Sequence, residues 1–283
     1  MGKRKTYFEE SLTRNVKTYQ QYLNLLIELS ISSFEWKNLP ETIDSRYIEM
    51  ELFTSGALVY FNDEVIGNLC LNCITNGQLN VYGYPISRRA YSRYNQYQKI
   101  LDDKNSVIIW NNYMHTNSQT NIDGFARRLS NIDRIIDVNV NAQKTPILVQ
   151  GNDKQRLSLI NLYKEYDGNT PVIFGDKTLD LNALKCLSTQ APYVADKLYE
   201  LKTKIWNEAL TYLGITNVTY QKKERMVTDE VMRSQGGTIA NRMSRLNSRR
   251  EAVEHINAMF GTDIEVNFID TNEQLNKGGD YSE

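Results

Sequence analysis

Cysteine and histidine are scarce in this chain of 283 residues, which has three cysteines and two histidines. So few cysteines argue against a disulfide framework and favour synthesis in a reducing cytoplasm. Cys70 and Cys73 form a C-x-x-C pair, but no second pair exists, and His115 and His255 lie far away in sequence. A zinc site would have to be assembled from scattered ligands. We therefore expect two packed thiols and no metal.

Long apolar runs are also missing. The longest, residues 23–29 and 107–110, are short or interrupted by Asn24 and Glu28. A membrane-spanning helix needs about 20 mainly apolar residues, so none is expected. Residues 1–10 are basic and then acidic, without the apolar centre of a signal peptide.

Motifs of nucleotide chemistry and nucleophilic catalysis are absent as well. The sequence has no G-x-x-x-x-G-K-[S/T] phosphate loop, no G-x-G-x-x-G after a strand and no G-x-S-x-G elbow. The nearest stretches, residues 151–154 and 236–238, lack the spacing needed to cradle a phosphate. We expect a non-enzymatic protein without cofactors, and a metal- or nucleotide-dependent enzyme is the weakest hypothesis.

Charge and tyrosine content limit the remaining functions. The formal net charge is −1, so any contact with nucleic acid must depend on local placement of positive residues. Eighteen tyrosines against eight phenylalanines fit either half-buried positions or a large oligomer interface. Between residues 82 and 97 three arginines alternate with five tyrosines, a mixture that could stack on single-stranded bases. A subunit contact is the favoured interpretation. The residues are Arg88, Arg89, Arg93, Tyr82, Tyr84, Tyr91, Tyr94 and Tyr97.

Apolar residues spaced by three or four predict five helices. They cover residues 11–34 with Ser11 as N-cap, 44 or 45 to 53, 118–142, 192–213 and 241–260. Pro192 suits a first turn, and Gly214 and Gly261 suit helix ends. Strands are expected within 56–66 and at 107–110, 147–149, 171–174 and 266–269.

The two long helices at 118–142 and 192–213 flank a small α+β insert. Within it we expect a strand at 147–149, a helix at 154–166, a strand at 171–174 and a helix at 179–187. A polar, charged loop follows Gly214 and continues to residue 237. Loops of this length are usually functional in compact domains.

Five sequence blocks in order resemble the portal protein, or upper collar, of small short-tailed phages with Gram-positive hosts. They are FEWKNLP (34–40), VNAQKTPIL (140–148), PVIF (171–174), APYVADKL (191–198) and KKERMVTDEV (222–231). The similarity is nearly continuous from 140 to 231, and the N-terminal third is similar mainly in pattern.

The resemblance implies a mainly α portal-type subunit with a small α+β clip, twelve copies of which form a ring around double-stranded DNA. The implied parts are the N-terminal wing (1–116), a stem helix (117–146), the clip (147–190), a second stem helix (191–215), a channel loop (216–240) and the C-terminal wing and tail (241–283). The clip would face the packaging ATPase and then the lower collar or tail. The wing would lie inside the shell, near capsid and scaffold proteins.

The same resemblance points to residues that meet DNA in the channel. They are Lys197, Lys222, Lys223 and Arg225, each repeated around a ring, with Asp196, Glu200 and Glu224 limiting how tightly DNA is held. A further lysine of the family before the APY block is replaced here by Ser188, with Lys185 nearby. Lys3, Arg4 and Lys5 are candidates for contact with the motor or a packaging RNA, or form a solvated terminus.

A competing hypothesis is a monomeric or dimeric nucleic-acid-binding regulator. It would use Arg242, Arg245 and Arg249, which the helical period places on one face of the helix at 241–260. Such a regulator would bind free nucleic acid with a salt-sensitive affinity, and the slope would reflect the number of phosphates contacted.

Overall fold

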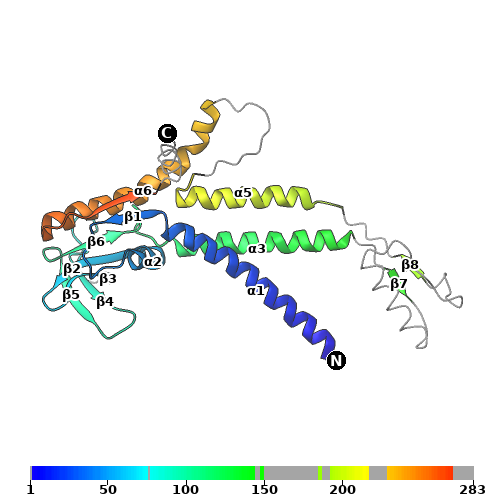
Figure 1. Ribbon diagram of the computed structural model, residues 1–283, viewed down its shortest axis with the longest axis horizontal. Helices are drawn as coiled ribbons and strands as arrows, with labels where there is room; N and C mark the ends of the chain where they lie inside the picture. Colours follow the sequence, from blue (N-terminus) through cyan, green and yellow to red (C-terminus); the bar gives the residue numbers. More distant parts are fainter. Residues whose placement is uncertain are drawn as a thin grey trace, which may run out of the picture. The chain divides into compact units, whose positions relative to one another are not determined.

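The computed structural model describes residues 2–75, 77–143, 147–149, 184–186, 192–216 and 228–269 (Figure 1). The chain divides into two compact units. Unit 1 contains Met1–Asn131 and Lys202–Glu283, and unit 2 contains Ile132–Leu201. No helix within the described ranges combines the length and hydropathy needed to cross a membrane.

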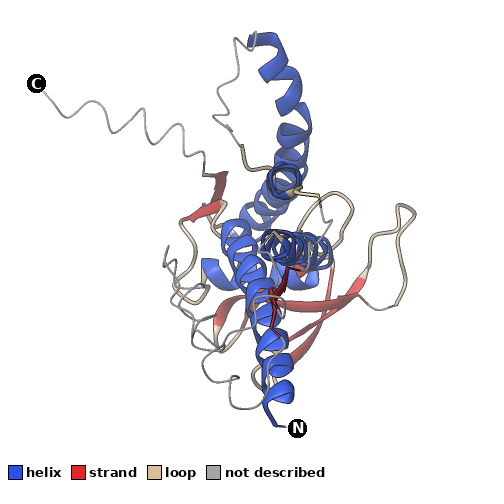
Figure 2. Cartoon of the chain, turned by 90° about the vertical axis from the view of Figure 1, so that its right-hand side faces the viewer, coloured by secondary structure: helices blue, strands red, loops and turns tan. Residues whose placement is uncertain are grey.

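A five-stranded antiparallel sheet forms the centre of unit 1, with its strands in red in Figure 2. The strand order is β5-β4-β3-β2-β6, and the bounds are β2 Ala57–Asp63, β3 Gly67–Thr75, β4 Ser87–Tyr91, β5 Gln98–Asp102 and β6 Ser106–Trp110. Side chains of β2 alternate between two apolar clusters, because successive strand residues point to opposite faces. Leu58 and Tyr60 belong to one cluster, and Val59 and Phe61 belong to the other.

Helices α2 and α6 and a second small sheet supply the cluster around Leu58 and Tyr60. Their bounds are α2 Ser45–Ser55, α6 Thr228–Phe260, β1 Phe34–Lys37 and β9 Glu265–Phe268, and β1 pairs with β9. Ile48 and Leu52 enter from α2, and Ile256 enters from α6. Burial of such side chains contributes about 1.5–3 kcal/mol each. Elements from both ends of the sequence are thereby held in one core.

Helix α1 runs from Gly2 to Ile31, whereas the sequence predicted 11–34 with Ser11 as N-cap. The prediction was wrong at both ends. Residues before Ser11 are mostly good helix formers, so no capping residue is needed there. At the other end the hydroxyls of Ser32 and Ser33 donate to the carbonyls of Glu28 and Leu29, and Phe34 begins β1.

The two long helices are confirmed as α3 Gln119–Ala142 and α5 Ala195–Leu213. α5 starts later than predicted. Pro192 precedes it, and the first helical hydrogen bond runs from the Leu198 amide to the Val194 carbonyl. The predicted end at Gly214 is correct: φ is +78°, and an added Cβ would lie 2.7 Å from the Arg242 backbone.

The predicted loop at 216–240 was wrong in its second half, because α6 already begins at Thr228. The helix continues through Gly236 and Gly237, which helix propensity alone disfavours by about 1 kcal/mol each. Contacts with Thr211 offset that cost. The Thr238 hydroxyl donates to the Thr211 hydroxyl at 3.3 Å, and the Asn241 side-chain amide donates to the Thr211 carbonyl at 2.9 Å. Residues 217–227 lie outside the described residues.

In unit 2 the predicted strand at 147–149 is confirmed as β7 Ile147–Val149. It pairs antiparallel with β8 Leu184–Cys186, so the helix predicted for 179–187 was wrong over these three residues. The elements predicted at 154–166 and 171–174 lie outside the described residues. The prediction of a mainly helical chain also understated the β content, since unit 1 is built on a five-stranded sheet.

Candidate functional site

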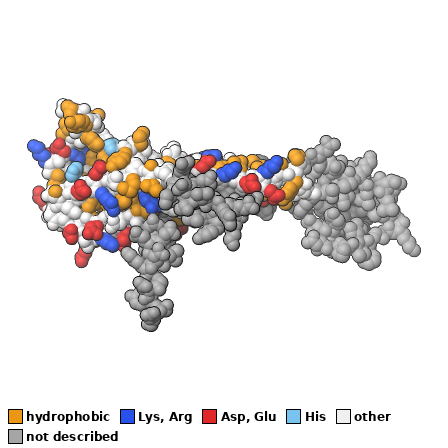
Figure 3. Space-filling model, turned by 90° about the horizontal axis from the view of Figure 1, so that it is seen from above, with side chains coloured by type: hydrophobic (Ala, Val, Ile, Leu, Met, Phe, Trp, Pro, Cys, Tyr) orange, Lys and Arg blue, Asp and Glu red, His pale blue; other side chains and the backbone are white. Residues whose placement is uncertain are grey.

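Helix α5 carries an exposed stripe of mixed charge. Lys197, Leu201, Lys204 and Glu208 are all exposed, and their spacing places them on one face of the helix. Lys197 and Lys204 are seven residues apart, so they stand about 10 Å apart along the helix axis. Positive, negative and apolar side chains all occur along the helices in Figure 3. Basic, acidic and apolar side chains are thus all exposed on α5.

Polar side chains join α3 and α5 in unit 1, where the start of α3 meets the end of α5. The Asn121 amide donates to the Tyr212 hydroxyl at 2.9 Å, and Arg128 pairs with Glu208 at 3.2 Å. Both members of that ion pair are about half exposed, at 52% and 55%, so it contributes about 1 kcal/mol or less. The apolar contact contributes more, because Ile122, Leu129, Ile205 and Leu213 are all buried.

In unit 2 the Asn139 side chain of α3 binds the backbone just before α5. The Asn139 amide donates to the Pro192 carbonyl at 2.9 Å, and its oxygen accepts from the Val194 amide at 3.0 Å. The backbone just before α5 thus gains both a donor and an acceptor from α3. Substitution of a capping side chain of this kind typically costs about 1 kcal/mol.

Several large apolar side chains of unit 2 remain exposed. Ile135 is 50% and Val138 is 68% exposed on α3, and Tyr199 is 61% exposed on α5. Tyr193, Leu201 and Val140 are exposed as well. So many apolar side chains on one short helix pair indicate a surface that another protein chain covers.

The DNA-contact residues implied by the resemblance are only partly within the described residues. Lys197 is exposed on α5, next to the exposed carboxylates Asp196 and Glu200. Lys185 lies in β8. Lys3, Arg4 and Lys5 lie in the first turns of α1, so the predicted basic tail is helical. Lys222, Lys223, Arg225, Glu224 and Ser188 lie outside the described residues.

The arginines of α6 hold the chain together internally. We call Arg242, Arg245 and Arg249 the arginine ladder. Arg242 donates to the Gly214 carbonyl at 2.9 Å, at the negative end of the α5 dipole. Arg245 donates to the Tyr212 carbonyl at 3.3 Å and to the Ser118 hydroxyl at 2.8 Å. Arg242 and Arg245 therefore join α6 to the end of α5 and the start of α3.

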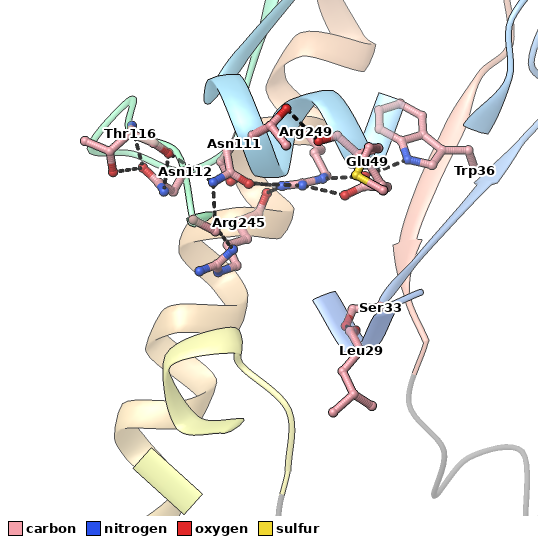
Figure 4. A network of polar contacts seen from close by, with 12 residues as sticks. Leu29, Ser33, Trp36, Glu49, Asn111, Asn112, Thr116, Arg245 and Arg249 are labelled. Carbon is pink, nitrogen blue, oxygen red and sulfur yellow. Dashed lines mark hydrogen bonds and ion pairs between the residues drawn. The ribbon is translucent and has the colours of Figure 1, made fainter. Parts of the chain in front are cut away.

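The third arginine, Arg249, forms a buried ion pair with Glu49 (Figure 4). Arg249 is 1% exposed, and its Nε and Nη2 donate to the two carboxylate oxygens of Glu49 at 2.8 and 2.7 Å. Trp36 donates its indole N–H to the same carboxylate, and Arg249 also donates to the Asn111 carbonyl. Both oxygens of this carboxylate are thus bound inside the protein.

These contacts contradict the hypothesis of a nucleic-acid-binding regulator. Arg245 is 4% exposed, and burial lowers the pKa of its guanidinium. Arg242 packs its guanidinium over the Phe268 ring at 4.4 Å. The buried charges of Arg245 and Arg249 cannot reach a phosphate, and the half-buried Arg242 is bound to the Gly214 carbonyl. The sequence correctly placed these three arginines on one face of the helix, but that face is turned toward the rest of the protein.

In residues 82–97, where arginines alternate with tyrosines, some side chains are likewise internal and others are exposed. Arg88 is buried at 5% exposure, and Arg93 pairs with the buried carboxylate of Glu51 at 3.2 Å. Tyr82 and Tyr94 are more than 80% exposed. A single-strand binding surface would need arginines and tyrosines on the same accessible face, whereas here Arg88 turns inward and the exposed Arg93 is paired with Glu51.

Cys70 and Cys73 pack on opposite faces of β3, in the two different core clusters. Burial raises the pKa of the Cys73 thiol to about 12 and raises that of Cys70 further. Within the described residues no group of three metal-ligating side chains is assembled.

Sequence reasoning missed Glu49, Asn111, Ser118 and Asn139, which complete these networks. Each is an ordinary polar residue, and only its distant partner gives it a role. Glu49 lies between Ile48 and the buried Leu52 in the apolar pattern of α2, which was a weak signal that it turns inward.

Comparison with known proteins identifies one family. The family described as Phage Connector (GP10) matches residues 4–272. Among solved structures, one described as the portal and tail of native bacteriophage P68 matches with a TM-score of 0.50 and 16% identity, over 95% of this chain and 94% of that one. A portal protein of the HK97 family from Corynebacterium diphtheriae matches at TM-score 0.41 and 13% identity, over 92% and 93%.

Proposed function

The chain belongs to the phage connector family, and we propose that twelve copies form a ring around double-stranded DNA at one vertex of a phage capsid. The family assigns it the role of portal or head–tail connector in DNA packaging. The observation that carries this conclusion is the family match over residues 4–272, supported by the portal fold shared with the P68 structure.

Exposed apolar side chains in unit 2 support assembly of copies. Ile135, Val138 and Tyr199 are each at least half exposed, on the helix pair that the resemblance assigns to the stem. In a ring, such a surface on one copy is covered by its neighbour, and each copy makes the same contact because the interface is head-to-tail. The cost of exposing these side chains in water is then removed.

Contact with DNA fits the mixed charge of α5. Lys197, repeated around a ring, would give a positive level that meets phosphates, and the neighbouring carboxylates would weaken each contact. Contacts with phosphates carry no sequence information, so DNA can slide past them. We propose Lys197, Lys222, Lys223 and Arg225 as the contacting residues.

The remaining partners follow the same assignment. We propose that residues 147–190 face the packaging ATPase during filling and the lower collar or tail afterwards. The sheet-based wing would contact capsid and scaffold proteins inside the shell of the virion. Lys3, Arg4 and Lys5 are the residues proposed for contact with the motor or a packaging RNA. The protein itself would supply no catalytic step.

Negative-stain electron microscopy of the purified full-length chain tests the proposal. We expect ring-shaped particles with a central channel and twelve-fold top views, and native mass spectrometry should give twelve times the 32.8 kDa subunit mass. Only monomers or dimers across a hundredfold concentration range would overturn it. A closed ring with another subunit number would correct the stoichiometry and retain the channel.

A further inference from the structure

A cavity of about 840 Å³ lies in unit 1 between β4, β6, the turn that precedes β4, and one face of α6. Its volume is within the range typical of small-molecule sites. Much of its wall is apolar, contributed by Pro85, Ile86, Val107, Ile108, Trp110 and Met259. His115 covers the Trp110 ring in a parallel stack with centroids 3.9 Å apart. The cavity thus offers an apolar, partly aromatic lining of stable shape.

Arg88 lines this cavity and has no counter-ion among the described residues. Its side chain is 95% buried, since only 5% is exposed. Its Nε has no hydrogen-bond partner in that part of the chain, and none of the ion pairs found there includes it. Burial lowers the pKa of its guanidinium, whereas nearby Asp103 acts in the opposite direction.

The chain itself shows what a buried arginine normally receives. Arg249 is buried to a similar degree, and a carboxylate binds it through both oxygens. A planar carboxylate matches two N–H groups of a guanidinium, which makes this pairing stronger than an ordinary hydrogen bond. Within the described ranges Arg88 has no such carboxylate, and it lies beside a cavity large enough to admit one.

The charged residues of the cavity wall limit the charge that a ligand can carry. Asp103 and Glu251 also line the cavity, and Glu251 already accepts from the Tyr113 hydroxyl at 3.0 Å. Two carboxylates beside one arginine would repel a dianion such as a phosphate monoester. A ligand with one negative charge and an apolar body satisfies both the arginine and the lining.

We propose that this cavity is a binding site for a carboxylate carried on an apolar or aromatic group, with Arg88 as the residue that binds the carboxylate. The carboxylate can belong to a free organic acid or to an acidic side chain beside an aromatic one in a peptide. This site lies in unit 1 and does not depend on the stem or on the proposed channel residues.

Ligand-observed NMR titration of the full-length protein tests the proposal with 3-phenylpropionate as probe. We expect binding in the millimolar range, as is usual for a compound of this size, and no binding of the uncharged 3-phenylpropanamide. Phenyl phosphate should bind more weakly than 3-phenylpropionate because it is a dianion. These comparisons use the unchanged protein, so they do not depend on how any variant folds.

Two variants locate the site. Arg88→Gln should weaken binding of 3-phenylpropionate about tenfold or more, because it removes a charge-assisted contact. Arg89→Gln is the matched control, since Arg89 follows on β4, points to the other face and does not line the cavity. Its affinity should equal that of the unchanged protein. Arg88→Gln should also keep or raise the melting temperature without ligand, because it removes an uncompensated buried charge.

The peptide acetyl-Phe-Glu-amide separates the two sources of the carboxylate. Tighter binding of this peptide than of 3-phenylpropionate assigns the site to an acidic protein segment, and the reverse assigns it to a free acid. Equal binding of the acid and its amide, no acid binding at about 10 mM, or an unchanged affinity in Arg88→Gln would each overturn the proposal. Ring assembly is unaffected by any of these results, so a failure here leaves the proposed function standing.

Discussion

Whether a buried arginine is satisfied depends on whether a buried carboxylate pairs with its charge. Arg249 and Glu49 are 1% and 3% exposed, and they satisfy each other through two hydrogen bonds. Arg249 also packs over the Phe34 ring at 4.0 Å, which connects α6 to β1. Because desolvation of both ions is costly, the pair contributes less to stability than the loss of one partner would cost. Through Glu49, Trp36 and Phe34 this pair links α6 to α2 and β1.

Loss of the Glu49 charge should therefore destabilise the fold strongly. We expect Glu49→Gln to lower the free energy of unfolding by about 3–5 kcal/mol, because Arg249 would stay buried without a counter-ion. Urea denaturation followed by circular dichroism at fixed protein concentration measures the change.

The matched control is Glu208→Gln, which removes a charge from the half-exposed pair with Arg128. It should cost about 1 kcal/mol or less, because water screens and replaces that contact. Similar decreases in the two variants would show that burial of the Arg249–Glu49 pair does not determine its importance.

At the scale of elements, α3 and α5 have two distinct kinds of surface. One surface is internal and includes the buried Ile122, Leu129 and Ile205. Another surface, in unit 2, leaves Val138 and Tyr199 more than 60% exposed although both are apolar or aromatic. A helix pair in a monomeric protein would normally present polar residues there. We propose that a neighbouring copy covers this second surface.

A charge placed on this surface should block assembly and leave the subunit folded. We expect Val138→Asp to reduce the fraction of rings about tenfold or more, since a buried carboxylate at each contact would lack a partner. Size-exclusion chromatography with light scattering measures the fraction, and circular dichroism checks the helix content.

Val65→Asp makes the same chemical change at a valine that is 92% exposed in the turn between β2 and β3. Rings of that variant should form normally. If Val138→Asp assembled as well as Val65→Asp, the exposed stem residues would not form the subunit contact.

At the scale of the whole molecule, a net charge of −1 is compatible with a DNA channel. In the proposed ring, symmetry would repeat each exposed lysine of α5 together with its neighbouring carboxylates. Lys197 and Lys204 lie near Glu200 and Glu208 on α5, so no level of the helix is strongly positive. Such a channel would hold DNA weakly enough for it to move in both directions.

If Lys222 and Lys223 contact DNA as proposed, their removal should change DNA retention without changing assembly. We expect Lys222→Ala with Lys223→Ala to form normal rings but to give fewer DNA-filled particles. Retention should also depend less on salt, with a slope that is smaller by about one for each phosphate that is no longer bound. Lys104→Ala, at an exposed turn of the wing sheet, is the control. An unchanged yield of filled particles in the double variant would remove these lysines from the channel.

Much of the fold could be predicted because periodic patterns are local. The apolar spacing of 118–142 and 192–213 located α3 and α5, and the apolar run at 107–110 located β6. Errors arose where distant contacts decide the structure. Leu184–Cys186 is a strand because it pairs with Ile147–Val149, and Gly236 and Gly237 are helical although local propensity favours a break there.

At the candidate sites, too, local sequence patterns did not reveal contacts between distant residues. Ordered sequence blocks were sufficient to identify the family, which the match over 4–272 confirms. The spacing of Arg242, Arg245 and Arg249 correctly placed them on one face, but spacing carries no information on whether that face meets water or protein. Arg88 and Arg89 are adjacent in sequence, yet only Arg88 lines the cavity.

By itself, the sequence determined the long helices, their ends at Gly214 and Gly261, and the membership of the family, because each depends on residues close together in the chain. Only the tertiary structure decided that the arginine ladder is internal, that α6 starts at Thr228, and that Arg88 is buried beside a cavity with no counter-ion among the described residues. The physical reason is that burial and charge pairing depend on partners more than a hundred residues away, such as Glu49 for Arg249, and their free energies exceed any local preference.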